Sequence, residues 1–380
     1  MLWSDLNMLK GKLLMAYHQE KKDLDYLRRL VRDLKPRVKR IYHQESWALS
    51  FVSSDGGVNR IYLNPCLLEI IRIVDSTGRE HVLDVLTASS TVEYLEQRIA
   101  DGPYCLPPLK KLCGDLRVSM AEISPFLKRM GEAGYAKQAL GCYRDILEWA
   151  VLYHLVLSAG DFEASDVILV RDGLLRTKAI RPTYFGKLRA NIERFIEKAR
   201  HRNQRLYLVG IAKESSVKEK LALAIKLEEL MALPYPCYVE IPPHVEKECY
   251  SRDNSWFVNY GELESGEPLQ SMGRLFLVKF GDHPLDPVWP VDIAVWQEHL
   301  AQEILSCLVK DAQAGFPIPD YPQCLQIAHE LASISNVEAE LLTDLLCEAL
   351  GNDLDDREKK ILYLFRCLNE NLSNLRYGGL

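Results

Sequence analysis

The chain has 380 residues, of which 48% are hydrophobic and 26% charged, and its net charge is −6. These values are ordinary for globular proteins and exclude collagen-like, low-complexity and wholly disordered chains. At roughly 150 residues per domain, the length predicts two or three domains, or one large core with additions. No apolar run reaches the ~18–20 residues that span a bilayer, and the N-terminus is polar and acidic where a signal peptide is apolar. We therefore expect a cytoplasmic protein with no membrane partner.

The ten cysteines are scattered along the chain and contain no CxxC pair. No group of Cys and His has the spacing of a zinc site. In a long chain without a secretion signal, this pattern predicts reduced thiols, several of them in the core, rather than a disulfide framework.

Two segments carry a strong excess of positive charge. Residues 176–205 contain ten Lys and Arg against two acids, and residues 10–40 contain eleven against four. A chain with such local excess can meet a polyanion at one place and stay soluble as a whole. Two solvated helix faces are the simpler explanation for either segment taken alone.

The first half of the chain changes its hydrophobic period once. Residues 1–40 carry Leu at spacings of three and four, which predicts a helix, and Pro36 ends it. Residues 47–57 are apolar and β-branched and predict a strand that ends at a pair of glycines; a second strand is expected from Cys66. The segment 76–145 is expected to be mainly helical and irregular.

The second half alternates helices and strands. We expect helices and strands in turn at 135–158, 166–170, 184–202, 205–211 and 217–232. Short strands are expected in the Pro-rich stretch 233–287, and helix from Val291 onward except for a loop at 315–322. This order predicts an α/β protein with one mixed sheet. The expected division is a helical segment 1–45, a core 46–290 with a helical insertion at 76–145, and a helical region 291–380.

Three acids occupy positions that suit chemistry. Asp55 follows the first predicted strand and precedes two glycines, and Asp172 ends a buried strand and precedes Gly173. Glu148 lies on the helix before that strand. A carboxylate at the edge of a core is costly to desolvate unless a cation is close, and a following glycine lets backbone or ligand approach.

Converging carboxylates are the ligands that Mg²⁺ and Mn²⁺ prefer. Two such ions activate water and stabilise a leaving oxygen in phosphodiester hydrolysis. We therefore expect Asp55, Glu148 and Asp172 to share a metal site. The alternative stays open, because DG is a common turn dipeptide and Glu148 could be a solvated helix residue.

Two further polar residues fit the same chemistry. Lys213 follows the predicted strand RLYLVGI, where its ammonium group could neutralise a phosphate. His329 follows a Pro-rich loop, on a helix with an apolar face. For each alone, a surface or capping lysine and a satisfied structural histidine are the simpler interpretations.

The basic segment after Asp172 is the predicted DNA contact. A helix there would carry four cations near the proposed site and would bind phosphates through them. These residues are Lys187, Arg194, Lys198 and Arg202.

Taken together, five motifs resemble the NurA nuclease family. They are SSDGG with Asp55, ILEWAVLYHL with Glu148, VILVRDGLL with Asp172, YLVGIAKES with Lys213, and YPQCLQIAHELASIS with His329. They occur in the family's order and extend over residues 47–335. The separation of Glu148 and Asp172 is longer than in the family.

The resemblance implies an RNase H-like fold and DNA cleavage that depends on Mn²⁺ or Mg²⁺, with two ions expected. It implies that Asp55, Glu148, Asp172 and His329 hold the metal, that Lys213 contacts phosphate, and that His329 could instead handle a proton. It also implies a homodimer that works with a HerA-type hexameric DNA-translocating ATPase in DNA end processing, in DNA repair or in phage defence.

The chain lacks GxxxxGK[ST], so a motor would have to be a separate protein, and it lacks the GxSxG nucleophile elbow. The apolar stripes of residues 1–34 and of the C-terminal helices could cap the core or dock a partner. Three alternatives stay open: a catalytically silent RNase H-like scaffold that recruits a translocase, an RNA-cleaving or Argonaute-type RNase H-like enzyme, and a helical adaptor with an α/β core.

Overall fold

A computed structural model of the chain describes residues 6–43, 49–63, 66–87, 89–132, 136–159, 166–251, 270–352, 354–362 and 364. Within them, one sheet of nine strands has the order β1-β7-β8-β9-β6-β5-β2-β3-β4. The strands are β1 (Lys39–Arg40), β2 (Leu49–Leu63), β3 (Cys66–Asp75), β4 (Glu80–Thr87), β5 (Asp166–Asp172), β6 (Arg205–Ile211), β7 (Cys237–Glu240), β8 (Gly273–Lys279) and β9 (Trp289–Ala294).

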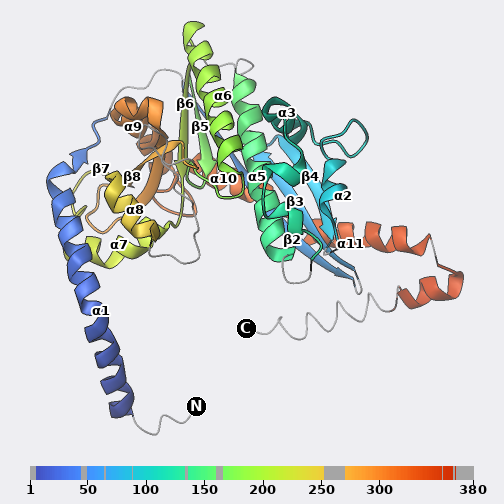
Figure 1. The fold of residues 1–380 in the computed structure, drawn as a ribbon, viewed down its shortest axis with the longest axis horizontal. Coiled ribbons are helices and arrows are strands. Elements are labelled where there is room, and N and C mark those ends of the chain that lie inside the picture. The colour runs from blue at the N-terminus through green and yellow to red at the C-terminus, as the bar shows by residue number, and fades with distance from the viewer. Residues whose placement is uncertain are drawn as a thin grey trace.

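Helices cover both faces of this sheet (Figure 1). They are α1 (Leu6–Leu34), α2 (Val92–Glu96), α3 (Pro107–Leu116), α4 (Met120–Ile123), α5 (Ala136–Leu157), α6 (Pro182–His201), α7 (Ser216–Leu227), α8 (Pro243–Ser251), α9 (Ala301–Gln313), α10 (Gln323–Ala332) and α11 (Asn336–Gly351). No described helix combines the length and the apolar character needed to cross a membrane.

Five adjacent strands in the order β4-β3-β2-β5-β6 form one end of the sheet. Strands β2, β3 and β4 make an antiparallel meander, β5 pairs parallel to β2, and β6 pairs parallel to β5. This order, with only β3 running against the others, is the topology of the RNase H-like fold. The predicted fold class is confirmed. The remaining strands extend the sheet beyond β6 with antiparallel pairings.

The alternation of side chains along β5 separates two hydrophobic cores. Val167 and Leu169 belong to the core formed with α3, α5 and α6. Ile168 and Val170 point to the opposite face and belong to the core formed with α9 and α10. Successive residues of a strand face opposite sides, so the functional side chains at the end of β5 are also divided between these two faces. A third cluster joins α1, α7 and α8 to β7 and β8.

The structure corrects three expectations. Strand β2 does not end at its two glycines but continues to Leu63. The segment 76–145 begins with β4, the third strand of the meander, and becomes helical only afterwards. Residues 289–294 form β9 rather than the start of a helix, because six successive buried residues pair with β6 and β8.

Two helices extend away from the body of the molecule, α1 downward at the left and α11 to the right (Figure 1). Only the C-terminal part of α1 is packed: Val31 and Leu34 are buried against α7. Arg28 and Arg32 also pair with Glu228 at 2.5 and 2.8 Å. Exposed apolar side chains remain on the outer part of α1 and on α11, namely Met8, Leu13, Leu14, Met15 and Tyr17, and Val337, Leu341 and Leu345.

Candidate metal centre

Three of the predicted site residues meet on the α10 face of the sheet. Asp55, Asp172 and His329 each offer one ligand atom, and these atoms lie within 4.8 Å of one another. Nδ1 of His329 is 2.6 Å from Oδ2 of Asp55. Asp55 is buried, whereas the side chain of His329 is 60% exposed, so the centre opens to solvent on the side of the imidazole.

The register of two parallel strands brings the two aspartates together. Ser54 on β2 pairs with Arg171 on β5, and this is the last pair of that ladder. Asp55 and Asp172 are the next residue on each strand, so they lie side by side where β2 and β5 diverge. Both point to the face covered by α10.

A glycine allows α10 to approach this point. A Cβ atom on Gly57 would lie 2.1 Å from the carbonyl oxygen of Ala332, the last residue of α10. A hydrogen bond adds a second contact between β2 and α10, because the Ser53 hydroxyl donates to the carbonyl of Cys324 at 2.7 Å. The close contact of β2 with α10 places His329 over Asp55. Gly57, which we expected to end a strand, instead lies within β2 and allows α10 to pack closely against that strand.

The carboxylate of Asp172 lies near that of Asp55 and near basic side chains. Burial and the charge of Asp55 raise the pKa of Asp172, while Lys213, Arg171 and His329 act in the opposite direction. The Lys213 ammonium group is 3.8 Å from Oδ2 of Asp172 and is 37% exposed. Lys213 therefore lies where the sequence predicted it, beside the aspartates and within reach of a solvent-borne anion.

Tyr321 was not predicted as a site residue, although it opens the motif that contains His329. Its hydroxyl donates to Oδ1 of Asp172 at 3.5 Å, and its side chain is fully buried. The ring packs against Trp289 at a tilt of 58° with centroids 4.8 Å apart, and the Lys213 ammonium group lies 5.5 Å from the Tyr321 centroid. Tyr321 thus supports both Asp172 and Lys213. Its place in the Pro-rich loop, directly before Pro322, was the only signal.

Glu148 lies on the other face of the sheet. Its carboxylate pairs with Arg144 at 3.2 Å and with Arg171 at 3.4 Å, and its side chain is 12% exposed. A Cβ atom on Gly56 would lie 2.7 Å from Oε1 of Glu148, so the first glycine of the pair makes room for this carboxylate. Burial raises the pKa of Glu148 to about 8. Glu148 lines a cavity that Asp172 also borders, and its role as a metal ligand stays a prediction.

Arg171 and Asp145, which the sequence analysis also missed, hold this second face together. The Arg171 guanidinium group binds Asp145 at 2.5 Å and the carbonyl of Leu174 at 2.8 Å, and it lies 4.8 Å from the ring centroid of Trp149. Asp145 also accepts the hydroxyl of Thr177. Arg171 directly precedes Asp172 in β5, so the side chains of these two residues point to opposite faces of the sheet.

The basic helix is placed differently from the expectation. Lys187, Arg194, Lys198 and Arg202 are all exposed. However, α6 starts near Asp172 and returns antiparallel to β5, and Arg205 after it pairs with Asp166 at the far end of that strand. Lys198 and Arg202 therefore lie at the end of the sheet opposite the metal triad, and only the start of α6 is near it.

Several solved structures are similar to this chain. The NurA nuclease from Sulfolobus solfataricus matches with 13% sequence identity and a TM-score of 0.44, over 93% of this chain and 99% of that one. A structure of NurA bound to dAMP and manganese matches with 14% identity and a TM-score of 0.41, over 94% and 100% of the two chains. Human ENDOV matches with 13% identity and a TM-score of 0.25, over 81% and 96%. No family model matches the sequence, and neither does any curated protein.

Proposed function

We propose that this protein is a divalent-metal-dependent nuclease that hydrolyses phosphodiester bonds of DNA. The observation that carries the proposal is the meeting of Asp55, Asp172 and His329 at one point of an RNase H-like sheet. These side chains come from three segments far apart in the chain. Two like charges at such a distance, one buried and one half-buried, repel each other, and a shared cation removes that cost.

The donor set fits a hard divalent cation with some preference for a transition metal. Carboxylate oxygens suit both Mg²⁺ and Mn²⁺, whereas an imidazole nitrogen is a ligand typical of transition metals. We therefore propose Asp55, Asp172 and His329 as the ligands and expect Mn²⁺ to be favoured over Mg²⁺. When bound, such ions activate water and stabilise the leaving oxygen of a phosphodiester.

The remaining residues would bind and orient. Lys213 would hold a non-bridging phosphate oxygen with its exposed ammonium group. Tyr321 would fix the rotamer of Asp172 through its hydroxyl. His329, with Nδ1 on Asp55, would either complete the metal site or move a proton at its exposed ring edge. The Glu148 carboxylate pairs with Arg144 and Arg171, and a role of Glu148 as a further ligand stays a prediction.

The proposal includes two partners. We propose a homodimer and a HerA-type hexameric DNA translocase, with a role in DNA end processing or phage defence. The exposed apolar side chains on the outer half of α1 support a docking role for that helix, since a long amphipathic helix rarely leaves such a face in water. DNA contact by the exposed cations of α6 also belongs to the proposal, with Lys187 closest to the centre.

A nuclease assay tests the proposal and its alternatives together. Labelled linear and circular DNA, and RNA of the same sequence, are incubated with Mn²⁺, Mg²⁺ or EDTA, with and without the cognate ATPase. We expect DNA cleavage that requires the metal. Cleavage of RNA alone would favour an RNA-directed RNase H-like enzyme. Binding of the ATPase with no cleavage of either substrate would favour a catalytically silent scaffold.

A further inference from the structure

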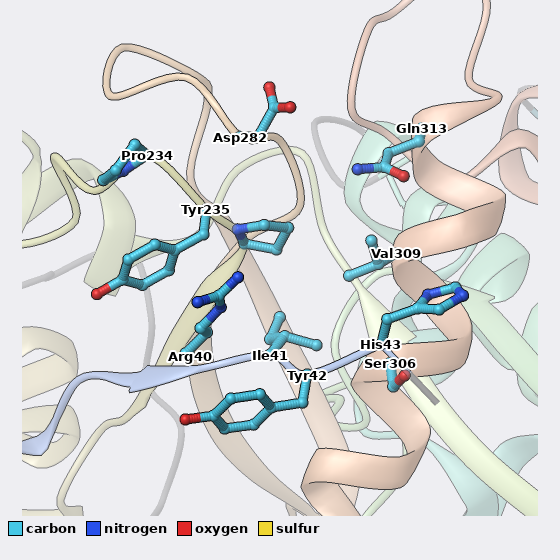
Figure 2. A pocket seen from close by; sticks show the side chains of 11 residues that line it. Arg40, Ile41, Tyr42, His43, Pro234, Tyr235, Asp282, Ser306, Val309 and Gln313 are labelled. Atoms are coloured by element: carbon cyan, nitrogen blue, oxygen red, sulfur yellow. The ribbon is translucent and has the colours of Figure 1, made fainter. Parts of the chain in front are cut away.

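A cavity of about 350 Å³ lies at one edge of the sheet, away from the metal triad. The end of β1, the segment that leads into β7, the loop after β8 and helix α9 surround it (Figure 2). Its volume is within the range of small-ligand sites. Its lining combines apolar residues, among them Ile41 and Val309, with aromatic, charged and polar side chains, namely Arg40, Tyr42, His43, Tyr235, Asp282 and Gln313.

An arginine between two tyrosine rings forms one wall of the cavity. The Arg40 guanidinium group is 4.7 Å from the ring centroid of Tyr235 and 5.7 Å from that of Tyr42. Figure 2 shows Arg40 pointing from its strand into the space between the two rings. In the part of the chain that the structure describes, Arg40 has no carboxylate partner. Tyr42 is 63% exposed, so a large aromatic face is presented to solvent without a packing role.

The strand register places this cavity on the same margin of the sheet as the metal centre. Asp172 ends β5 beside the end of β6, which lies beside the start of β9 and the end of β8. The start of β7 and the end of β1 follow at that margin. Four strand spacings of roughly 4.8 Å separate β5 from β7, on the order of 19 Å. The cavity also borders α9, which covers the same face as α10.

We propose that this cavity binds a nucleobase of single-stranded DNA whose scissile phosphate lies at the metal triad. The inference rests on the proposed function and adds a second contact point to it. Aromatic rings and arginine planes are the groups on which unpaired bases stack. Asp282 and Gln313 would accept and donate hydrogen bonds at a base edge. Because the Asp282 carboxylate repels phosphate, the base rather than the backbone enters.

The test measures DNA binding in EDTA, where no cleavage occurs. Two labelled single strands of twelve nucleotides are compared by fluorescence polarisation, one of thymidines and one abasic throughout. We expect Tyr42→Ala to weaken binding of the thymidine strand about tenfold, the usual scale of one stacked base, and to leave the abasic strand unchanged. Tyr42→Phe keeps the ring and should retain the affinity of the wild type.

A matched control comes from the opposite face of the sheet. Tyr104 is 64% exposed and also lies beside an arginine, Arg98, at 5.7 Å. Tyr104→Ala should bind both strands like the wild type. If Tyr42→Ala binds the thymidine strand as tightly as the wild type, or weakens both strands equally, the cavity holds no base and the inference is wrong. Cleavage of DNA by the wild type is measured separately, so the proposed function can stand when this inference fails.

Discussion

Nδ1 of His329 lies 2.6 Å from Oδ2 of Asp55, although 274 positions separate these residues in the chain. A metal-binding histidine usually donates its second ring nitrogen to a carboxylate or carbonyl, which fixes its orientation. Here the acceptor is itself a candidate ligand. The contact therefore joins α10 to strand β2 and fixes one side of the proposed metal centre.

The first prediction concerns Asp172. Asp172→Ala should lower DNA cleavage by roughly a thousandfold, because metal-based stabilisation of the transition state is worth several kcal/mol. In EDTA its melting temperature should equal or exceed that of the wild type, since one of two mutually repelling carboxylates is gone. Scanning calorimetry with an activity assay measures both. Full activity in Asp172→Ala would remove it from the site.

The second prediction separates phosphate binding from metal binding. Lys213→Ala should reduce cleavage on the order of a hundredfold, the scale for removing one charge-stabilising donor. Its affinity for Mn²⁺, measured by titration calorimetry, should change little, because the ammonium group is not a ligand. Lys213→Arg keeps the charge and should recover part of the activity. A collapse of Mn²⁺ affinity in Lys213→Ala would instead indicate that Lys213 holds Asp172 in place.

The third prediction uses the pH dependence of stability. The pKa of Glu148 is about 8 in the folded protein, against an ordinary value of 4.5. Between these values the folded state binds the extra proton, so the stability that Glu148 contributes is complete below pH ~4.5 and is lost as pH rises through 8. Glu148→Gln should therefore raise the melting temperature at pH 9 by on the order of 2 °C or more. The gain should shrink toward pH 5. An equal rise in melting temperature at pH 5 and pH 9 would contradict the raised pKa of Glu148.

The fourth prediction concerns the packing of α10 against Gly57 of β2. Gly57→Ala places a methyl group against the carbonyl of Ala332 and should destabilise the protein by about 1–3 kcal/mol, the usual cost of overpacking. Cleavage should fall further than the loss of folded protein explains, because His329 moves away from Asp55. Gly141→Ala is the control, since nothing lies within 4 Å of the added atom. Denaturant titration and an activity assay on the folded fraction distinguish the two effects.

The fifth prediction concerns the outer half of α1. Removing residues 1–22 keeps Val31, Leu34 and the pairs with Glu228, so the fold should survive. We expect light scattering to give twice the chain mass of 43.5 kDa for the full protein. The truncation should impair ATPase-stimulated cleavage more than basal cleavage. Equal loss of both activities with an intact fold would assign the helix to the nuclease site itself.

Several elements could be predicted because their signals are local. Buried runs such as DVILV and RLYLVGI mark β5 and β6, and a turn after each places Asp172 and Lys213 at one margin. The motif order was also sufficient to predict the RNase H-like class, which the strand pairing confirms. Asp55, Asp172 and His329 were chosen from the sequence, and the structure brings them together.

The remaining features depend on contacts between distant segments. The role of Gly57 follows from α10, which lies far along the chain, so a local interpretation takes it as a turn. Glu148 has the right residue type, but its helix packs on the other face, where Arg171 binds it. The direction of α6 depends on the parallel pairing of β5 and β6, because the helix that connects them must run back along the sheet. Tyr321 carries no periodic signal, and only tertiary packing shows its contact with Asp172.

The central claim is that Asp55, Asp172 and His329 share a cation that DNA cleavage requires. Its most direct test is the rate of cleavage of labelled linear DNA as Mn²⁺ is added back to EDTA-treated protein, for the wild type and Asp172→Ala side by side. We predict that the wild type regains cleavage with a saturable dependence on Mn²⁺, while the variant stays inactive at every concentration. Cleavage by the wild type in EDTA, or the same Mn²⁺ dependence in both proteins, would contradict the claim.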